Sequence, residues 1–150
     1  MQRRKGFSLV EVMVVVVVLA IAAVGSQMLA PMSATRSMQA ASESRKLMAA
    51  LRMTRQTALA SQSPVRLRLL GSPRSITGYV IEQQSGGRFN PITPDELLSG
   101  LPTVTSNAAS VLFAPTGAAD VSLAVTLGTD MQTHQVSVVA ATGLVRYVKK

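Results

Sequence analysis

Hydrophobic and polar positions divide the chain into three regions, at residues 7–30, 31–63 and 64–150. In the first region almost every side chain is apolar, and residues 12–24 carry no charge. A helix that crosses the hydrocarbon core of a membrane needs about 20 mostly apolar residues, at ~1.5 Å of rise each. In lipid, a single segment satisfies all of its backbone hydrogen bonds only as a helix. The pattern therefore predicts a transmembrane helix over residues 7–30.

The second region has the spacing of an amphipathic helix. Its buried stripe is expected at positions i, i+4, i+7 and i+11, which are Leu47, Leu51, Thr54 and Ala58. Pro64 follows the region, and proline does not continue a helix because it lacks a backbone N–H. Residues 31–63 therefore predict a helix with one buried face. Arg45, Arg52 and Arg55 form a basic ridge beside this face, which indicates either a solvated surface or a contact for a neighbouring subunit.

The third region changes to the period of two that is typical of strands. Val65, Leu67 and Leu69 alternate with polar residues, so we expect one face of this strand to be buried. Residues 78–83 predict a return strand. The next residues, 84–99, predict a surface loop with a short helical turn at 95–98. The remaining strand candidates are residues 103–104, 111–113, 121–127, 135–139 and 144–148.

One long helix followed by strands predicts an α+β fold. The N-terminal helix is first transmembrane and then amphipathic, and its second half packs on a C-terminal antiparallel β domain. About 120 residues remain beyond the membrane segment, which is enough for one domain. The chain contains no Cys, so packing alone must stabilise that domain.

The formal net charge is +8, and the first basic residues set the orientation of the predicted membrane helix. Arg3, Arg4 and Lys5 stand just before the apolar region. Positive charge next to a membrane helix is retained on the cytoplasmic side. The short N-terminus is therefore expected in the cytoplasm and the β domain on the other side of the membrane.

One carboxylate interrupts the apolar region at Glu11. A charged side chain at membrane depth costs at least ~2.5–3.5 kcal/mol, so such a residue is expected to be functional and to have a partner. An amine is the candidate partner. A secretory signal peptide or a plain membrane anchor would explain the basic start and the apolar length, but neither explains Glu11.

The residues around this carboxylate resemble the class III signal of the type IV pilin superfamily, through Gly6, Phe7, Ser8, Leu9 and Glu11. The resemblance implies that a prepilin peptidase cleaves after Gly6 and removes residues 1–6 as a leader. It also implies N-methylation of Phe7 and retention of the apolar helix. In this superfamily the carboxylate that matches Glu11 is thought to pair with the terminal amine of a neighbouring subunit, which sets the register of assembly.

The β-rich region, residues 64–150, and the helix before it are similar to the GspH/FimT family of minor pseudopilins and minor pilins. The matching pieces occur in the order of the family: Arg55 with Ala58, residues 65–67, residues 113–117, and residues 136–143 ending in Gly143. Turn chemistry alone also accounts for the Pro and Gly positions. The resemblance implies a pilin-like fold.

Candidate catalytic and metal-binding groups are few. His134 is the only histidine and Cys is absent, so neither a Cys/His pair nor a multi-His metal site can form within the chain. We expect His134 in a loop or at a strand end. Asp120 and Asp130 are isolated, and a calcium site needs several converging oxygen ligands. The sequence predicts a protein that is not an enzyme and that holds no metal or cofactor.

The C-terminus carries the cations Arg146, Lys149 and Lys150. Clustered cations attract phosphate, so this segment indicates either a solvated basic tail or a contact with DNA. Some FimT-type minor pilins are thought to bind DNA through a Gly-Arg-x-Arg-like tail. Here Gly143 is followed by Leu144, so the first Arg of that tail is missing.

The resemblance implies a minor pseudopilin of a type II secretion system, at or near the tip of a short periplasmic filament that drives protein export. The alternative is a FimT-like minor pilin that initiates a type IV pilus and binds DNA for uptake. Either subunit would be a single-pass protein of the inner membrane with its β domain in the periplasm. The expected partners are prepilin peptidase, other minor subunits, the major subunit and membrane lipid, with nucleic acid as a further partner in the alternative.

Overall fold

The computed structural model describes residues 9–27, 32–98, 103–129 and 132–149. Gly6, Phe7, Asp130 and Lys150 lie outside these ranges, as does the whole leader. The chain divides into two compact units, Met1–Met32 and Ser33–Lys150.

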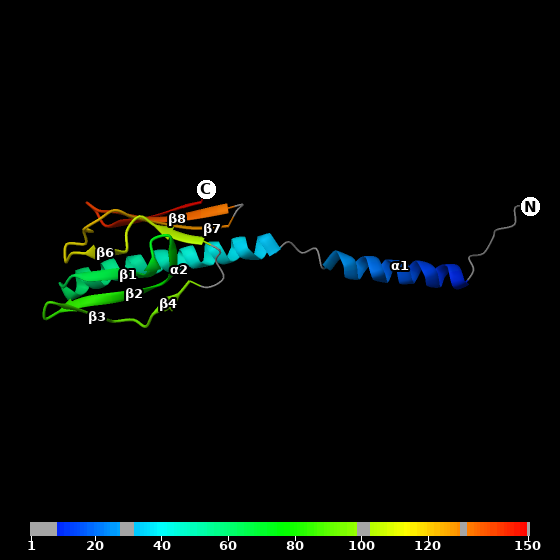
Figure 1. The fold of residues 1–150 in the computed structure, drawn as a ribbon, viewed down its shortest axis with the longest axis horizontal. Helices are drawn as coiled ribbons and strands as arrows, with labels where there is room; N and C mark the ends of the chain where they lie inside the picture. Colours follow the sequence, from blue (N-terminus) through cyan, green and yellow to red (C-terminus); the bar gives the residue numbers. More distant parts are fainter. Residues whose placement is uncertain (1–8, 28–31, 99–102, 130–131, 150) are drawn as a thin grey trace, which may run out of the picture. The chain divides into compact units, whose positions relative to one another are not determined.

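The first unit contains helix α1 (Leu9–Gln27), drawn in blue in Figure 1. Valine is a weak helix former in water, and α1 is rich in it. Every residue from 9 to 20 is exposed, so nothing in the described chain covers these apolar side chains. Over the described residues, no helix meets the length and apolarity required to cross a membrane. The transmembrane helix over residues 7–30 stays a prediction.

Helix α2 (Met32–Ser61) is the central element of the second unit. Its expected stripe is fully buried at all four positions, Leu47, Leu51, Thr54 and Ala58. The Thr54 hydroxyl is hydrogen-bonded within this apolar stripe, because it donates to the carbonyl of Ala50 at 2.7 Å. The helix is followed by Gln62, whose φ of 51° is left-handed. The Gln62 amide donates to the carbonyl of Leu59 at 2.8 Å, which satisfies one of the free carbonyls at the helix end.

Five strands form the first antiparallel sheet: β1 (Val65–Ser72), β2 (Ser75–Ser85), β3 (Arg88–Pro91), β4 (Glu96–Leu97) and β6 (Ser110–Phe113). Their order is β3-β2-β1-β6, and β4 also pairs with β2. Val65, Leu67 and Leu69 of β1 are buried, and the residues between them are partly exposed. The alternation expected after Pro64 is confirmed.

Four strands form the second antiparallel sheet: β5 (Thr103–Ser106), β7 (Leu123–Thr129), β8 (Gln132–Val139) and β9 (Leu144–Lys149). Their order is β5-β7-β8-β9. On β8, His134, Val136 and Val138 are buried, whereas the residues between them are partly exposed. This alternation gives the second sheet one buried face.

A single hydrophobic core joins α2 to both sheets. It includes Leu47 and Leu51 of α2, Leu67 and Phe113 of the first sheet, and Val125 and Val136 of the second. Figure 1 shows α2 running alongside strands of both sheets. The predicted α+β fold, a helix packed on a C-terminal antiparallel β domain, is confirmed.

The prediction of a short helical turn at residues 95–98 is wrong. Glu96 and Leu97 form strand β4, which pairs with Gly78 and Tyr79 of β2. The pairing depends on Gly78, since a Cβ atom at this position would lie 2.4 Å from the Glu96 carbonyl oxygen. Only glycine leaves room for the backbone of β4 to approach this closely. Residues 88–91, also expected in a surface loop, form strand β3.

The expectation of a loop or strand-end position for His134 is also wrong. His134 is the third residue of β8, and only 2% of its surface is exposed. The strand begins at Gln132, three residues earlier than the pattern indicated. A strand is recognised in a sequence when apolar and polar residues alternate. At the start of β8 the buried residue, His134, is itself polar, so this alternation is missing there.

Candidate functional site

The start of α1 places Glu11 in the first helical turn, next to exposed apolar side chains. Backbone N–H groups at a helix start favour a carboxylate there. Leu9 is 78% exposed and Val10 is 68% exposed, so the apolar surface around Glu11 is open. Large exposed apolar surfaces mark contacts with lipid or protein. Of the three residues expected to act in processing and assembly, the structure describes Glu11, while Gly6 and Phe7 lie outside the described residues.

Arg55, Gly117 and Gly143 come together at one point of the second unit, and we call this group the Arg55 clasp. Arg55 Nε donates to the Gly117 carbonyl oxygen at 3.0 Å. A Cβ atom on Gly143 would lie 1.9 Å from the same oxygen, so no other residue fits there without a shift of the backbone. The clasp joins α2 to the turn after β6 and to the turn between β8 and β9.

The clasp also changes the interpretation of the basic ridge. Arg45 and Arg52 are exposed, whereas Arg55 is half-buried and bonded to Gly117. The ridge is therefore split between two exposed cations and one contact within the fold. All three clasp residues belong to the motif pieces that were singled out in the sequence, although sequence order alone did not show that they meet.

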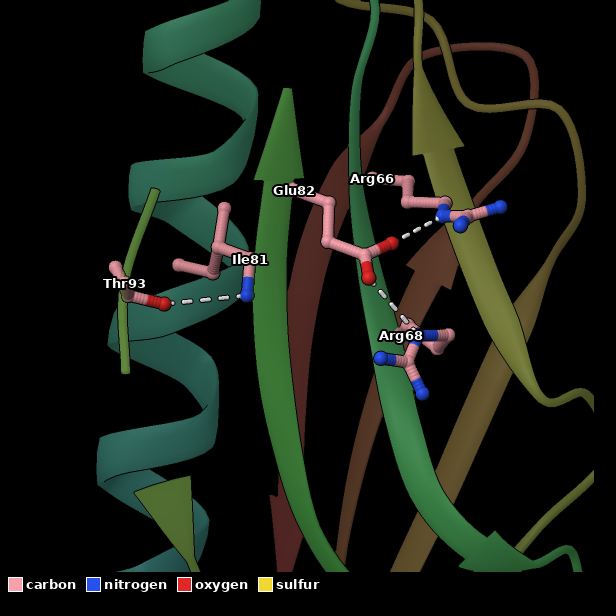
Figure 2. A network of polar contacts seen from close by, with 5 residues as sticks. All are labelled: Arg66, Arg68, Ile81, Glu82 and Thr93. Atoms are coloured by element: carbon pink, nitrogen blue, oxygen red, sulfur yellow. Dashed lines mark hydrogen bonds and ion pairs between the residues drawn. The ribbon is translucent and has the colours of Figure 1, made fainter. Parts of the chain in front are cut away.

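A second polar group lies on the first sheet, where Glu82 of β2 points toward Arg66 and Arg68 of β1 (Figure 2). Arg66 Nε is 2.5 Å from Glu82 Oε2, and Arg68 Nε is 3.0 Å from Glu82 Oε1. The Arg66 guanidinium lies over the Phe89 ring at 4.1 Å, a cation–π contact. Nearby, Ile81 N donates to Thr93 Oγ1 at 3.2 Å, which ties the segment after β3 to β2.

These contacts determine the charge state of Glu82. Burial alone would raise the pKa of the Glu82 carboxyl, but the hydrogen bonds and positive charges of Arg66 and Arg68 outweigh burial and lower it. The carboxylate is therefore ionised at neutral pH. Sequence reasoning did not identify this group, because it depends on the register that pairs Arg66 with Glu82 across the two strands.

The His134 ring lies beside Tyr147, with His134 Nδ1 2.6 Å from the Tyr147 hydroxyl oxygen. The two rings are stacked, with centroids 5.8 Å apart. Within the described residues, the buried Nε2 atom of His134 has no hydrogen-bond partner. Burial lowers the pKa of His134, and the nearby charges of Lys149 and Arg45 lower it further. The ring is therefore neutral at pH 7.

The described chain contains no group of three or more His, Cys, Asp or Glu side chains able to hold a metal ion. Asp120 has a structural contact, since its Oδ1 accepts hydrogen bonds from the backbone N–H groups of Leu112 and Val121, both at 2.8 Å. Asp130 lies outside the described residues.

The structure does not gather the C-terminal cations onto one face. Arg146 and Lys149 are both exposed, but they are three positions apart on β9 and therefore point to opposite faces of the sheet. Arg146 pairs with Ser137 and Lys149 with His134, and neither neighbour adds a positive charge at neutral pH. Lys150 lies outside the described residues. DNA binding through these three residues stays a prediction.

An N-terminal apolar helix with one carboxylate, followed by a helix packed on antiparallel sheets, defines a pilin-like subunit. Residues 43–143 match the family described as Type II transport protein GspH, and residues 1–26 match the prokaryotic N-terminal methylation motif. The chain belongs to the GspH family, within the type IV pilin superfamily. Proteins with this motif are processed by a peptidase, anchored in a membrane and assembled with other pilins.

Two solved structures share the fold. Both are crystal structures of the type IV minor pilin FimU from Pseudomonas aeruginosa strain PAO1. The first has a TM-score of 0.64 and 15% identity, covering 76% of this chain and 91% of FimU. The second has a TM-score of 0.58 and 16% identity, covering 71% and 90%. No curated protein matches the chain. At 15% and 16% identity, the similarity to FimU establishes a shared fold and no shared function.

Proposed function

We propose that the chain is a minor pseudopilin of a type II secretion system, a non-catalytic subunit at or near the tip of a short periplasmic filament that drives protein export. The observation that carries the proposal is the exposed apolar helix α1 with Glu11 in its first turn. An exposed apolar surface of this kind is buried in lipid before the filament assembles and against other subunits afterwards.

Glu11 gives that surface an assembly role. After cleavage behind Gly6, Phe7 carries a free amine, and Glu11 is the fifth residue of the processed chain. A carboxylate that leaves lipid for a helical filament core must be paired, because a single buried charge is strongly disfavoured. The terminal amine of a neighbouring subunit is the partner of matching charge. The proposal also has α1 in the inner membrane and the β domain in the periplasm.

The choice of machine is supported by the family description, which refers to type II transport. The alternative is a minor pilin that initiates a type IV pilus, and the shared fold with FimU is compatible with it. Both machines use the same processing and the same kind of helix. They differ in what the finished filament does.

Deletion of the gene, followed by two assays in the same strain, tests the proposal. We expect loss of exoprotein secretion with surface pili retained, and recovery of secretion when the intact chain is supplied again. Loss of pili with normal secretion would favour the alternative. Normal secretion together with normal pili would contradict both assignments. A chain with Arg52→Ala on the exposed face of α2 is the matched control and should restore secretion fully.

A further inference from the structure

Most strand edges of the described residues are blocked. Residues 118–120 cover the outer side of β6, where Asp120 N donates to the Leu112 carbonyl at 2.9 Å. The four-residue strand β3 ends in Pro91, which has no N–H to offer. The last residue of β5, Ser106, donates to the Pro73 carbonyl at 2.8 Å and so abuts the turn between β1 and β2. β4 has only two residues.

The outer edge of β9 has no such protection. β9 is six residues long and pairs with β8 in an unbroken register from Leu144 to Lys149. It contains no proline and no bulge, and no other described strand pairs with its second side. In Figure 1, β9 is the red strand at the end of the chain, beside β8. An open edge of this length is a template for an added strand.

The Arg55 clasp holds this edge in place. Gly143 lies directly before β9, in a turn that packs so closely on Gly117 that an added Cβ would lie 1.9 Å from the Gly117 carbonyl oxygen. Arg55 bonds to the same carbonyl from α2. An edge that is already ordered loses little conformational entropy when another strand binds it.

The side chains of the edge select the kind of partner. Leu144 and Val148 are both 46% exposed and lie on the same face as Arg146, between them. The four strands of the second sheet contain no Asp or Glu, so no carboxylate within the sheet neutralises Arg146 and Lys149. Alternate residues of a strand share one face, so an added strand with apolar, acidic and apolar residues at three alternate positions complements Leu144, Arg146 and Val148 in both shape and charge.

A second copy of the chain does not complement it. Antiparallel pairing of β9 with β9 would bring the Arg146 side chains of two copies onto one face of a joined sheet. Like charges close together on paired strands are destabilising, and the sheet has no carboxylate to offset them. DNA is also a poorer fit, because Arg146 and Lys149 point to opposite faces and apolar side chains flank Arg146.

We propose that β9 is a docking edge for an extended segment of a partner protein, which joins the four-stranded sheet as an additional strand and places an acidic side chain opposite Arg146, between apolar side chains on the same face. The proposal does not depend on the secretion or pilus assignment. Main-chain hydrogen bonds supply the affinity, and the acidic residue of the segment selects this edge through Arg146.

The test uses the full processed chain in detergent micelles and the synthetic peptide Thr-Val-Thr-Glu-Thr-Val-Thr, whose two valines and one glutamate share one face of the strand. Amide hydrogen exchange, followed by mass spectrometry, reports protection of residues 144–149. We expect the peptide to slow exchange in this segment and not in β3. The same peptide with every internal amide N-methylated should not bind, because neither of its edges then offers an N–H donor. A peptide with lysine in place of the glutamate should fail as well.

Charge reversal tests the selectivity. The variant Arg146→Glu should weaken binding of the acidic peptide on the order of tenfold. The matched control, Arg52→Glu, changes the same charge at an exposed position outside β9 and should bind normally. The proposal is overturned by equal binding of the N-methylated peptide or by no protection at all. Concentration-dependent protection of β9 without peptide, or protection by duplex DNA instead, would also overturn it.

Discussion

Glu11 combines an ionisable side chain with an apolar surface that the described chain leaves open. We predict that Glu11→Ala is still cleaved after Gly6, because the peptidase acts on the segment before the helix. The variant should co-assemble poorly with partner subunits, since the incoming amine loses its carboxylate. Mass spectrometry of the chain and cross-linking to partner subunits measure the two effects.

Glu11→Asp serves as the control for this variant, because it keeps the charge and shortens the side chain by one methylene group. It should assemble better than the alanine variant. Normal assembly of the alanine variant would remove the pairing role from Glu11.

His134 predicts how stability depends on pH. Its pKa is lowered by burial and by Lys149 and Arg45, while the unfolded chain takes up a proton below about pH 6.5. The free energy of unfolding should therefore be highest above that pH and fall as the pH drops toward the folded-state pKa. The fall is at most about 1.4 kcal/mol per pH unit. Denaturant titrations between pH 7.5 and about pH 5 measure it.

The variant His134→Gln lacks the titrating ring and should flatten this dependence, even if it lowers stability overall. Glu82 does not contribute to the change in unfolding free energy between pH 7.5 and about pH 5. Its lowered pKa gives a contribution that is lost only as the pH falls below the ordinary value of 4.5. An unchanged slope in the His134 variant would assign the pH dependence to another group.

At the scale of elements, the turn between β8 and β9 depends on Gly143. We predict that Gly143→Ala lowers the free energy of unfolding by about 3 kcal/mol or more, because a left-handed backbone and a steric conflict add together. The φ angle is +61°, and the new Cβ would lie 1.9 Å from the Gly117 carbonyl oxygen. Thermal or denaturant unfolding of the processed chain measures the loss.

Gly86 provides a matched comparison for this substitution. Its φ is +59°, but nothing lies within 4 Å of an added Cβ. Gly86→Ala should therefore cost only the backbone term, about 1–2 kcal/mol. Equal losses of unfolding free energy at the two positions would show that the close approach of Gly143 to Gly117 adds nothing to the cost of the substitution.

Elements with strong periodicity could be predicted from the sequence, and elements that depend on a distant partner could not. The stripe at Leu47 and Leu51 and the alternation after Pro64 are local patterns that burial dictates. Strand β4 exists because Gly78, some 18 positions earlier in the chain, admits its backbone. Likewise, the contact of Glu82 with Arg66 requires the register of two strands, which no local pattern specifies.

The candidate site divides in the same way. Gly6, Phe7 and Glu11 lie within one stretch of six residues, so the sequence alone brings them together. Arg55, Gly117 and Gly143 are also visible in the sequence, but only the fold shows that they meet at one carbonyl. The neutral state of His134 depends on burial and on the charges of Lys149 and of Arg45 in α2, which only the fold brings near the ring.

At the scale of the whole molecule, processing should change both mass and charge. Removal of the leader with Arg3, Arg4 and Lys5 lowers the formal net charge from +8 to +5. We predict that a bulky residue in place of Gly6 blocks cleavage, so that the leader stays attached. The intact mass of the chain from the membrane fraction shows the outcome. A processed mass in that variant would argue against a prepilin peptidase.

The Arg55 clasp has a mechanical consequence for the second unit. In the filament proposed above, a subunit is loaded along its helix, and α2 is bonded through Arg55 to the turn at Gly117. The turn at Gly143 packs closely on the Gly117 carbonyl, so the clasp links α2 to the hairpin of β8 and β9. We therefore expect the helix and the hairpin to move together under an axial force.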